Sequence, residues 1–319
     1  MQPTRRQSLI AHLLLLAVVF VWGTTFTLVK SALTHVSPLL FNLLRMAIAA
    51  IVLAAINFSF LKKLTVQDIR LGALTGIFLA VGYQFQTAGL TLTTASKSAF
   101  ITGLVVVFVP LLAAIPHLAP PGSPKPTIAT ACGALLAFIG LALLTATPGS
   151  GLALLSGFHL GEALVLACAI AFAAHLLTIA RAAPRMPARR LGTLQIAFAA
   201  LTMLVLLPLE KLTSTGIFFH PAPVVWIALA VTALLATAAA FTIQSWAQQH
   251  LPATHTALIF TLEPVFAWLF SLLFLGEHLG PRALSGAALI LAGILLAELA
   301  STPPSAKFQA NSTANPGIL

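Results

Sequence analysis

Charged residues are scarce in this sequence. Asp, Glu, Lys and Arg make up 7% of its 319 residues, whereas 59% are hydrophobic and the mean hydropathy is +1.04. A soluble globular domain carries about 25% charged residues, and no polar stretch here is long enough to form such a domain. The composition therefore predicts one membrane-embedded unit rather than two globular domains.

Acidic residues are the scarcer sign, with six against sixteen Lys and Arg, and the formal net charge is +10. A basic chain can indicate a nucleic-acid partner. Here, however, the basic side chains lie in short connections between apolar runs, where they orient membrane helices. No basic face with stacking aromatics accompanies them, so we expect no nucleic-acid binding.

The sequence also lacks the motifs of several chemistries. It contains no GxxxxGK[ST] phosphate loop, no HExxH or CxxC motif, no acidic cluster and no nucleophile-elbow pattern. We therefore expect no ATP-driven transport, no metal, no cofactor and no enzymatic activity. The two cysteines, Cys132 and Cys168, lie inside apolar runs, and we expect buried apolar side chains rather than a disulfide.

What the sequence does contain is ten apolar runs of helix length, and about 20 helical residues cross a bilayer. The first run follows Arg5 and Arg6, as in a signal peptide. It continues into Trp22 and Gly23 without a small-residue cleavage site, so we interpret it as a span. The all-α membrane protein that we expect has spans at 9–29, 38–60, 69–91, 95–117, 126–146, 158–180, 190–209, 223–246, 253–275 and 281–300.

The ten runs divide into two copies of a five-span repeat. Because each copy has an odd number of spans, the second copy must be inverted in the bilayer, as in many secondary transporters. The expected units are 8–147, 158–300 and a disordered cytoplasmic tail at 301–319. The copies align as 21–50 with 171–200 (offset 150), 82–101 with 240–259 (offset 158) and 130–144 with 283–297 (offset 153).

The distribution of Lys and Arg predicts the orientation. With a cytoplasmic start, eleven fall in the inner loops and termini and four in the outer ones. This bias favours cytoplasmic positions for both termini. We expect a multi-pass protein of the bacterial inner membrane.

Two charged residues inside spans are the strongest candidates for substrate contact or coupling. Arg45 would bind an anion or act in gating, or it would snorkel to the outer headgroups. Glu263 would bind a proton or a substrate amine beside the helix-loosening Pro264, or it would be a structural carboxyl that is protonated or paired. Glu263 aligns with Val105 and Arg45 with Gln195, so both features are asymmetric.

The remaining candidates are polar or aromatic residues for which a structural role is also open. Gln86 and Gln244 are repeat equivalents on small-residue stripes that would serve helix packing or a cavity. His175 would be hydrogen-bonded packing or a coupling group. Tyr83 and Trp22 would line the pocket or anchor at the interface, and Lys97 would lie in the pocket or in a solvated loop. Three glutamates near span ends are expected to face water: Glu162, Glu210 and Glu298.

Three stretches together resemble the EamA-type proteins of the drug/metabolite transporter superfamily: 20–30, 93–113 and 253–297. The last contains Pro264 and ends its ninth span with Gly276-Glu277. The resemblance implies ten helices, a central cavity between two repeats, and alternating-access export or exchange of small metabolites such as amino acids. In the first repeat, Ala119 stands where Glu277 would map, so the halves depart from strict equivalence.

Two other functions are kept as hypotheses: a non-transporting membrane sensor or scaffold, and an intramembrane enzyme acting on lipid-linked substrates. A sensor would need a docking segment longer than the 19-residue tail. The expected partners of the transporter are a small-molecule substrate, the lipid bilayer and a coupling proton or ion. The expected oligomeric state is a monomer or a weak dimer.

Overall fold

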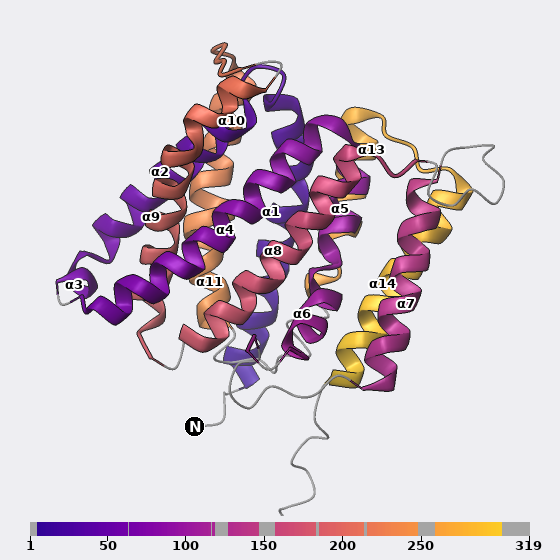
Figure 1. The fold of residues 1–319 in the computed structure, drawn as a ribbon, viewed down its shortest axis with the longest axis horizontal. Helices are drawn as coiled ribbons and strands as arrows, with labels where there is room; N and C mark the ends of the chain where they lie inside the picture. Colours follow the sequence, from indigo (N-terminus) through magenta and orange to yellow (C-terminus); the bar gives the residue numbers. More distant parts are fainter. Residues whose placement is uncertain are drawn as a thin grey trace, which may run out of the picture.

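The computed structural model describes residues 5–62, 64–115, 117–118, 127–146, 157–182, 185–213, 216–247 and 259–301 (Figure 1). The expected loop between the repeats and most of the expected tail lie outside these ranges. Within them the chain is helical apart from turns and one isolated bridge between Val36 and Phe219.

Each of the ten predicted runs is mainly helical in its described part. The first half contains α1 (Arg5–Ala32), α2 (Pro38–Ile56), α3 (Phe58–Leu61), α4 (Val66–Leu92), α5 (Ala95–Gly103), α6 (Val105–Ala113) and α7 (Ile128–Thr145). The second half contains α8 (Leu160–Ala182), α9 (Ala188–Leu206), η1 (Leu207–Leu212), α10 (Pro223–Ala230), η2 (Val231–Ala239), α11 (Ala240–Ala247), α13 (Glu263–Leu275) and α14 (Pro281–Ser301).

Seven helical segments of the described chain are long and apolar enough to cross a membrane. Two shorter apolar helices, α13 and the first part of α14, accompany them. The polar side chains of α4, among them Gln84 and Gln86, lower its hydropathy, although it is long enough to span. The seven are Leu9–Ala32, Pro38–Ile56, Ala95–Ala113, Ile128–Thr145, Leu160–Ala182, Ala188–Leu212 and Pro223–Gln244.

Besides the break at Asn57 between α2 and α3, near the end of the run at 38–60, two of the predicted spans are interrupted near their middle. The run at 95–117 divides at Leu104, which ends α5 and precedes α6. The run at 253–275 is divided by a turn, and α13 begins only at Glu263, after Leu262. Pro264 explains the second break, because a residue without an N–H is tolerated in the first turn of a helix but not in its interior. Leu104 and Leu262 are repeat equivalents, 158 positions apart, so the interruption occurs in both halves.

Glycines allow α7 and α14 to pack backbone against backbone (Figure 1, right). A Cβ on Gly133 would lie 2.6 Å from the Gly293 carbonyl oxygen, and one on Gly140 would lie 2.6 Å from the Gly286 carbonyl oxygen. The early residue of one helix meets the late residue of the other, so the two helices run antiparallel. Small residues at such contacts permit close approach of membrane helices.

Helices α2 and α9 are also repeat equivalents that run antiparallel. Asn57, at the end of α2, donates to the Thr193 hydroxyl near the start of α9 (3.1 Å). At the opposite end, Glu210 of η1 accepts from the amide of Leu39 (2.7 Å) and the hydroxyl of Ser37 (2.8 Å). The start of α2 therefore meets the chain after α9.

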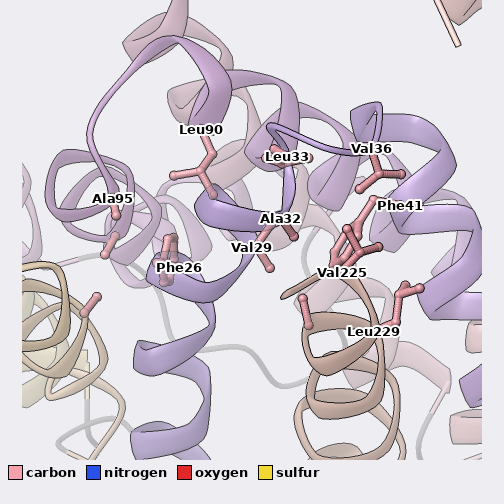
Figure 2. Packing of buried hydrophobic residues seen from close by; sticks show 13 residues of the cluster. Phe26, Val29, Ala32, Leu33, Val36, Phe41, Leu90, Ala95, Val225 and Leu229 are labelled. Atoms are coloured by element: carbon pink, nitrogen blue, oxygen red, sulfur yellow. The ribbon is translucent and has the colours of Figure 1, made fainter. Parts of the chain in front are cut away.

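The end of the bundle where α2, α5 and α10 begin is called the far end here. The end where α1 and α9 begin is the N-terminal end. An apolar layer closes the far end, built from buried residues of α1, the turn after it, α2, α4, α5, α10 and α13 (Figure 2). Phe26, Val29, Leu33, Phe41, Leu90 and Val225 belong to this layer, and each is at most 7% exposed.

The expectation that the span-end glutamates face water is wrong for the two whose side chains are described. Glu162 and Glu210 are 4% and 5% exposed. Glu162 accepts from the Thr93 hydroxyl (2.5 Å), and Glu210 caps the start of α2. Because each carboxylate meets N–H or O–H donors of the first repeat, burial leaves it hydrogen-bonded. The side chain of Glu298 lies outside the described part.

Candidate functional site

A central cavity of about 140 Å³ lies between helices of both repeats. Seven of the eight predicted substrate or coupling residues line it: Trp22, Arg45, Tyr83, Gln86, His175, Gln244 and Glu263. Lys97 does not. Lining residues that the sequence analysis did not select include Thr25, Phe26, Val29, Thr102, Phe172, Leu176, Ile179, Phe241 and Phe260.

Most of the cavity wall consists of repeat-equivalent pairs. At the offset of 150 these are Trp22 with Phe172, Thr25 with His175, Phe26 with Leu176 and Val29 with Ile179. At the offset of 158 they are Tyr83 with Phe241, Gln86 with Gln244, Thr102 with Phe260 and Val105 with Glu263. The alignment of the two copies could therefore have found three of the missed residues: Thr25, Phe172 and Phe241 are the equivalents of the selected His175, Trp22 and Tyr83.

Arg45 is buried in the cavity wall, with 4% of its surface exposed. Its Nε donates to the hydroxyl of Thr237 on η2 (3.0 Å), and its Nη2 donates to the hydroxyl of Tyr83 on α4 (3.1 Å). The guanidinium carbon also lies 4.2 Å from the centroid of the Tyr83 ring, within cation–π range. Of the two interpretations of Arg45, the structure therefore supports the interior one over snorkelling.

Glu263 stands in the first turn of α13, where a helix N-terminus favours negative charge. Its side chain is partly buried and faces the cavity. Within the described residues, the salt bridges are Lys97 with Glu162 and Arg190 with Asp68, and neither involves Glu263. The carboxylate is thus available to a cation or a hydrogen-bond donor that enters the cavity.

The polar groups of the wall are held by hydrogen bonds to neighbouring helices. His175 Nε2 is bonded to Gln195 Oε1 (2.8 Å), so the residue aligned with Arg45 positions a cavity imidazole. Gln86 donates to the Thr102 hydroxyl (3.2 Å), and Trp22 Nε1 donates to the Ala236 carbonyl of η2 (2.8 Å). Such bonds orient the side chains before any ligand arrives.

Aromatic pairs complete the wall. Tyr83 and Phe172 meet edge to face with ring centroids 5.1 Å apart. Their repeat equivalents, Phe241 and Trp22, are tilted with centroids 6.0 Å apart. Trp22 also meets Phe260 at 5.6 Å. The cavity therefore combines a guanidinium and a carboxylate with mainly apolar and aromatic surroundings, which is the composition of a small-molecule site.

Comparison with known families decides what kind of protein has this architecture. The sequence of this chain matches the EamA-like transporter family twice, at residues 9–146 and 159–299. The chain belongs to the EamA-like transporter family. The chain thus contains two copies of the family's repeat, and the family is one of membrane transporters rather than an enzyme class.

Relatives of this EamA-like chain include two proteins named as transporters. An "uncharacterized transporter" of Archaeoglobus fulgidus is 34% identical over 92% of this chain and 87% of its own length. The "uncharacterized transporter YoaV" of Bacillus subtilis is 24% identical over 88% of this chain and 94% of its own length. A crystal structure of a 21% identical protein superposes with a TM-score of 0.62, covering 91% of this chain and 97% of that one, and this likeness concerns the fold.

Pro264, Gly276 and Glu277, which the sequence analysis singled out, do not line the cavity and serve packing instead. Gly276 has a φ of +65° at the end of α13, a left-handed conformation that glycine adopts without strain. Glu277 then accepts from the amides of Ala95 and Ser96 at the start of α5 (2.9 and 3.0 Å). Pro264 is buried in the first turn of α13. These three residues fix the ends of α13 and join it to the first repeat.

Lys97 lies in the same far-end junction rather than in the cavity. Its Nζ is 4.0 Å from Glu162 Oε1, and its side chain is 26% exposed. Among the described residues, no group of three His, Cys, Asp or Glu side chains is arranged to hold a metal ion.

Proposed function

We propose that this EamA-like protein is a secondary active transporter that exports or exchanges small polar or amphipathic metabolites, including amino-acid-like solutes, by alternating access. The observation that carries the proposal is the central cavity, because it joins Arg45 of one repeat to Glu263 of the other across a mainly apolar space. The guanidinium suits a carboxylate or other anion, the carboxylate suits an amine, and the aromatic wall suits an apolar body.

The proposed topology is ten membrane helices in two inverted repeats, 8–147 and 158–300, with both termini in the cytoplasm of a bacterial cell. Two relations support it. The repeat-equivalent helices α2 and α9 run antiparallel, as do α7 and α14. In addition, the contact between α7 and α14 is symmetric. Gly133 aligns with Gly286 and Gly140 with Gly293, so exchanging the repeats turns the Gly133–Gly293 contact into the Gly286–Gly140 contact. An inverted pair of repeats produces both relations.

The proposed roles follow from the contacts. Arg45 and Glu263 bind charged groups of the solute, Gln86 and Gln244 supply hydrogen bonds, and Tyr83 and Trp22 supply aromatic surface. Glu263 and His175 are the proposed groups for coupling to protons. Both line the cavity, and each can exchange a proton with a bound solute or water.

Substrate class can be identified by thermal stability of the purified protein in the presence of amino acids, nucleosides, sugars or polyamines. A ligand that binds only the folded state raises the apparent stability. Uptake of the stabilising compound into proteoliposomes then tests the site. A hydrogen bond to a charged group contributes about 1.5–3 kcal/mol to binding, and each 1.4 kcal/mol is about a factor of ten in affinity. Glu263→Gln and Arg45→Ala should therefore each reduce flux at subsaturating solute about tenfold or more.

Matched controls separate a site effect from a general one. Arg70 is exposed at the start of α4 and Lys97 lies outside the cavity, so Arg70→Ala and Lys97→Gln should retain flux. Each variant must elute as a monodisperse protein. Unchanged flux in both Glu263→Gln and Arg45→Ala would refute the site assignment.

A further inference from the structure

A second cavity of about 380 Å³ lies toward the N-terminal end of the bundle. It is formed by the early part of α1, the end of α2, the start of α9 and α11. Its wall includes Leu14, Asn57, Thr193 and Trp246. The exposed Arg189 also borders it, so a charged side chain in contact with solvent lies at its rim.

Phe241 lines both cavities. Phe241 is the second residue of α11. Its ring packs against the ring of Trp22, with a centroid distance of 6.0 Å. Trp22 is in turn fixed by its bond to the Ala236 carbonyl. The Phe241 side chain is therefore part of the wall between the two spaces, held against an aromatic partner that is itself anchored.

The helix before Phe241 is unusual. Residues Val231–Ala239 form a π-helix, and the amide of Ala240 donates to the carbonyl of Leu235, five residues earlier. π-Helical segments are rare, and most occur as short interruptions of α-helices at functional sites. Thr237 of this segment accepts the hydrogen bond from Arg45. Arg45, one of the two charged residues of the central cavity, thus contacts the π-helical segment that precedes α11.

The opposite side of the central cavity is closed differently. Tyr83 and Phe172 are the repeat equivalents of Phe241 and Trp22, and there the tyrosine hydroxyl is bound by Arg45. The apolar layer of Figure 2 shares Phe26, Val29 and Leu90 with the wall of the central cavity. Contacts between the two repeats at the far end are made by Glu162, Glu210 and Glu277. Phe241 has no hydroxyl, so it cannot form the corresponding polar contact.

We propose that Phe241 is the gate between the two cavities, and that the second cavity is the vestibule through which solute reaches or leaves the central cavity. Movement of α11 about η2 would withdraw Phe241 from Trp22 and join the two spaces. The inference rests on the proposed transport function for its purpose. Its structural content, a removable aromatic barrier, can be tested without any substrate.

The test measures thiol reactivity in detergent-purified protein. Leu176 lines the central cavity, so Leu176→Cys is introduced together with Cys132→Ala and Cys168→Ala. The rate of modification by a small charged methanethiosulfonate is followed by intact-mass spectrometry. Adding Phe241→Ala should raise this rate tenfold or more, because the reagent can then pass from the vestibule into the central cavity.

Two matched variants make the result specific. Phe260 also contacts Trp22 and lines the central cavity, but it does not line the second one, so Phe260→Ala should raise the rate much less. Gly192 borders the second cavity with no atom within 4 Å of its added Cβ. The thiol of Gly192→Cys should therefore react rapidly whether residue 241 is Phe or Ala.

The gate is refuted if Phe241→Ala leaves the Leu176→Cys rate unchanged, or if Phe260→Ala raises it equally. Slow reaction of Gly192→Cys would also overturn it, because the vestibule would then be closed to solvent. The proposed gate and the proposed transport function can be refuted independently of each other. A strong Phe241→Ala effect on labelling, without flux of any tested solute, would retain the barrier and reject the proposed function.

Discussion

Arg45 and Tyr83 form a two-part contact in the wall of the central cavity. The guanidinium donates to the phenol oxygen at 3.1 Å while its carbon lies 4.2 Å from the ring centroid. The contact joins α2 to α4, and the bond from Arg45 to Thr237 extends it to η2 in the second repeat. One cation thus connects three helices at the depth where a solute would bind.

The Tyr83→Phe variant separates the two parts, because it keeps the ring and removes the acceptor. Hydrogen bonds between membrane helices contribute about 0.6 kcal/mol on average and up to about 1.7 kcal/mol. We expect a loss of free energy of unfolding in the upper part of this range, since the donor is charged. Unfolding of the purified protein by titration with a denaturing detergent measures it.

Thr91→Val is the matched control for Tyr83→Phe. It also removes a hydroxyl from α4, but that hydroxyl is exposed and bonds only to the carbonyl of Ala88 in its own helix. It should change stability by less than about 0.5 kcal/mol. Equal stability of Tyr83→Phe and the wild type would contradict the contact.

The antiparallel contact of α7 and α14 predicts a steric effect. A Cβ on Gly133 would lie 2.6 Å from the Gly293 carbonyl oxygen and 2.7 Å from the Ala297 amide nitrogen. Both are backbone atoms, so Gly133→Ala can be accommodated only by separating the helices. We expect a destabilisation of about 1–3 kcal/mol, measured by the same unfolding titration.

Gly192→Ala provides the comparison, because it makes the same change in another helix where the added Cβ has no atom within 4 Å. Alanine favours helix over glycine by about 0.5–1 kcal/mol, so this variant should be neutral or more stable. If Gly133→Ala were as stable as Gly192→Ala, close backbone packing of α7 on α14 would be wrong.

Asp68 predicts a pH dependence at the N-terminal end of the bundle. Its carboxylate accepts from the amide of Thr65 (3.0 Å) and from Arg190 of α9 (2.9 Å). The Thr65 amide first, and Arg190 in addition, hold the pKa of Asp68 below its usual value. The resulting stability is present above the unfolded-state pKa of about 3.9 and is lost as the pH falls through the lower folded-state pKa.

Asp68→Asn should therefore be less stable than the wild type at neutral pH, and the difference should shrink as the pH falls below about 4. Free energies of unfolding measured between about pH 3 and pH 7 test this. The exposed Arg70→Gln, two positions away, should show no such convergence. A difference that stays constant over this range would argue against the ionised contact.

The repeat and the helical runs could be predicted because both are local properties of the sequence. Apolar runs of about 20 residues need only composition, and equivalent positions need only alignment. The breaks at Leu104 and Leu262 were missed, although Pro264 was noted. An apolar run with turn geometry has the same hydropathy as a continuous helix, so periodicity alone does not reveal the interruption.

The burial of charged groups was the second feature that could not be predicted from the sequence. Glu210 was assigned to water by its place near a span end, yet it caps α2 from 171 positions away. Arg45 was left between two environments for the same reason. Whether such a group meets lipid headgroups or a hydrogen-bonding partner depends on which helix lies opposite, and that is a long-range contact.

The sequence by itself determined that this is a helical membrane protein made of two related halves, because hydrophobicity and repetition are written along the chain. It also contained the residues of the central cavity, most of them in aligned pairs. Only the tertiary structure decided that Arg45 faces Tyr83 and Thr237, that Lys97 lies outside the site, and that Phe241 separates two cavities. Those relations depend on how helices from different halves pack, and packing is a property of surfaces that are far apart in the sequence.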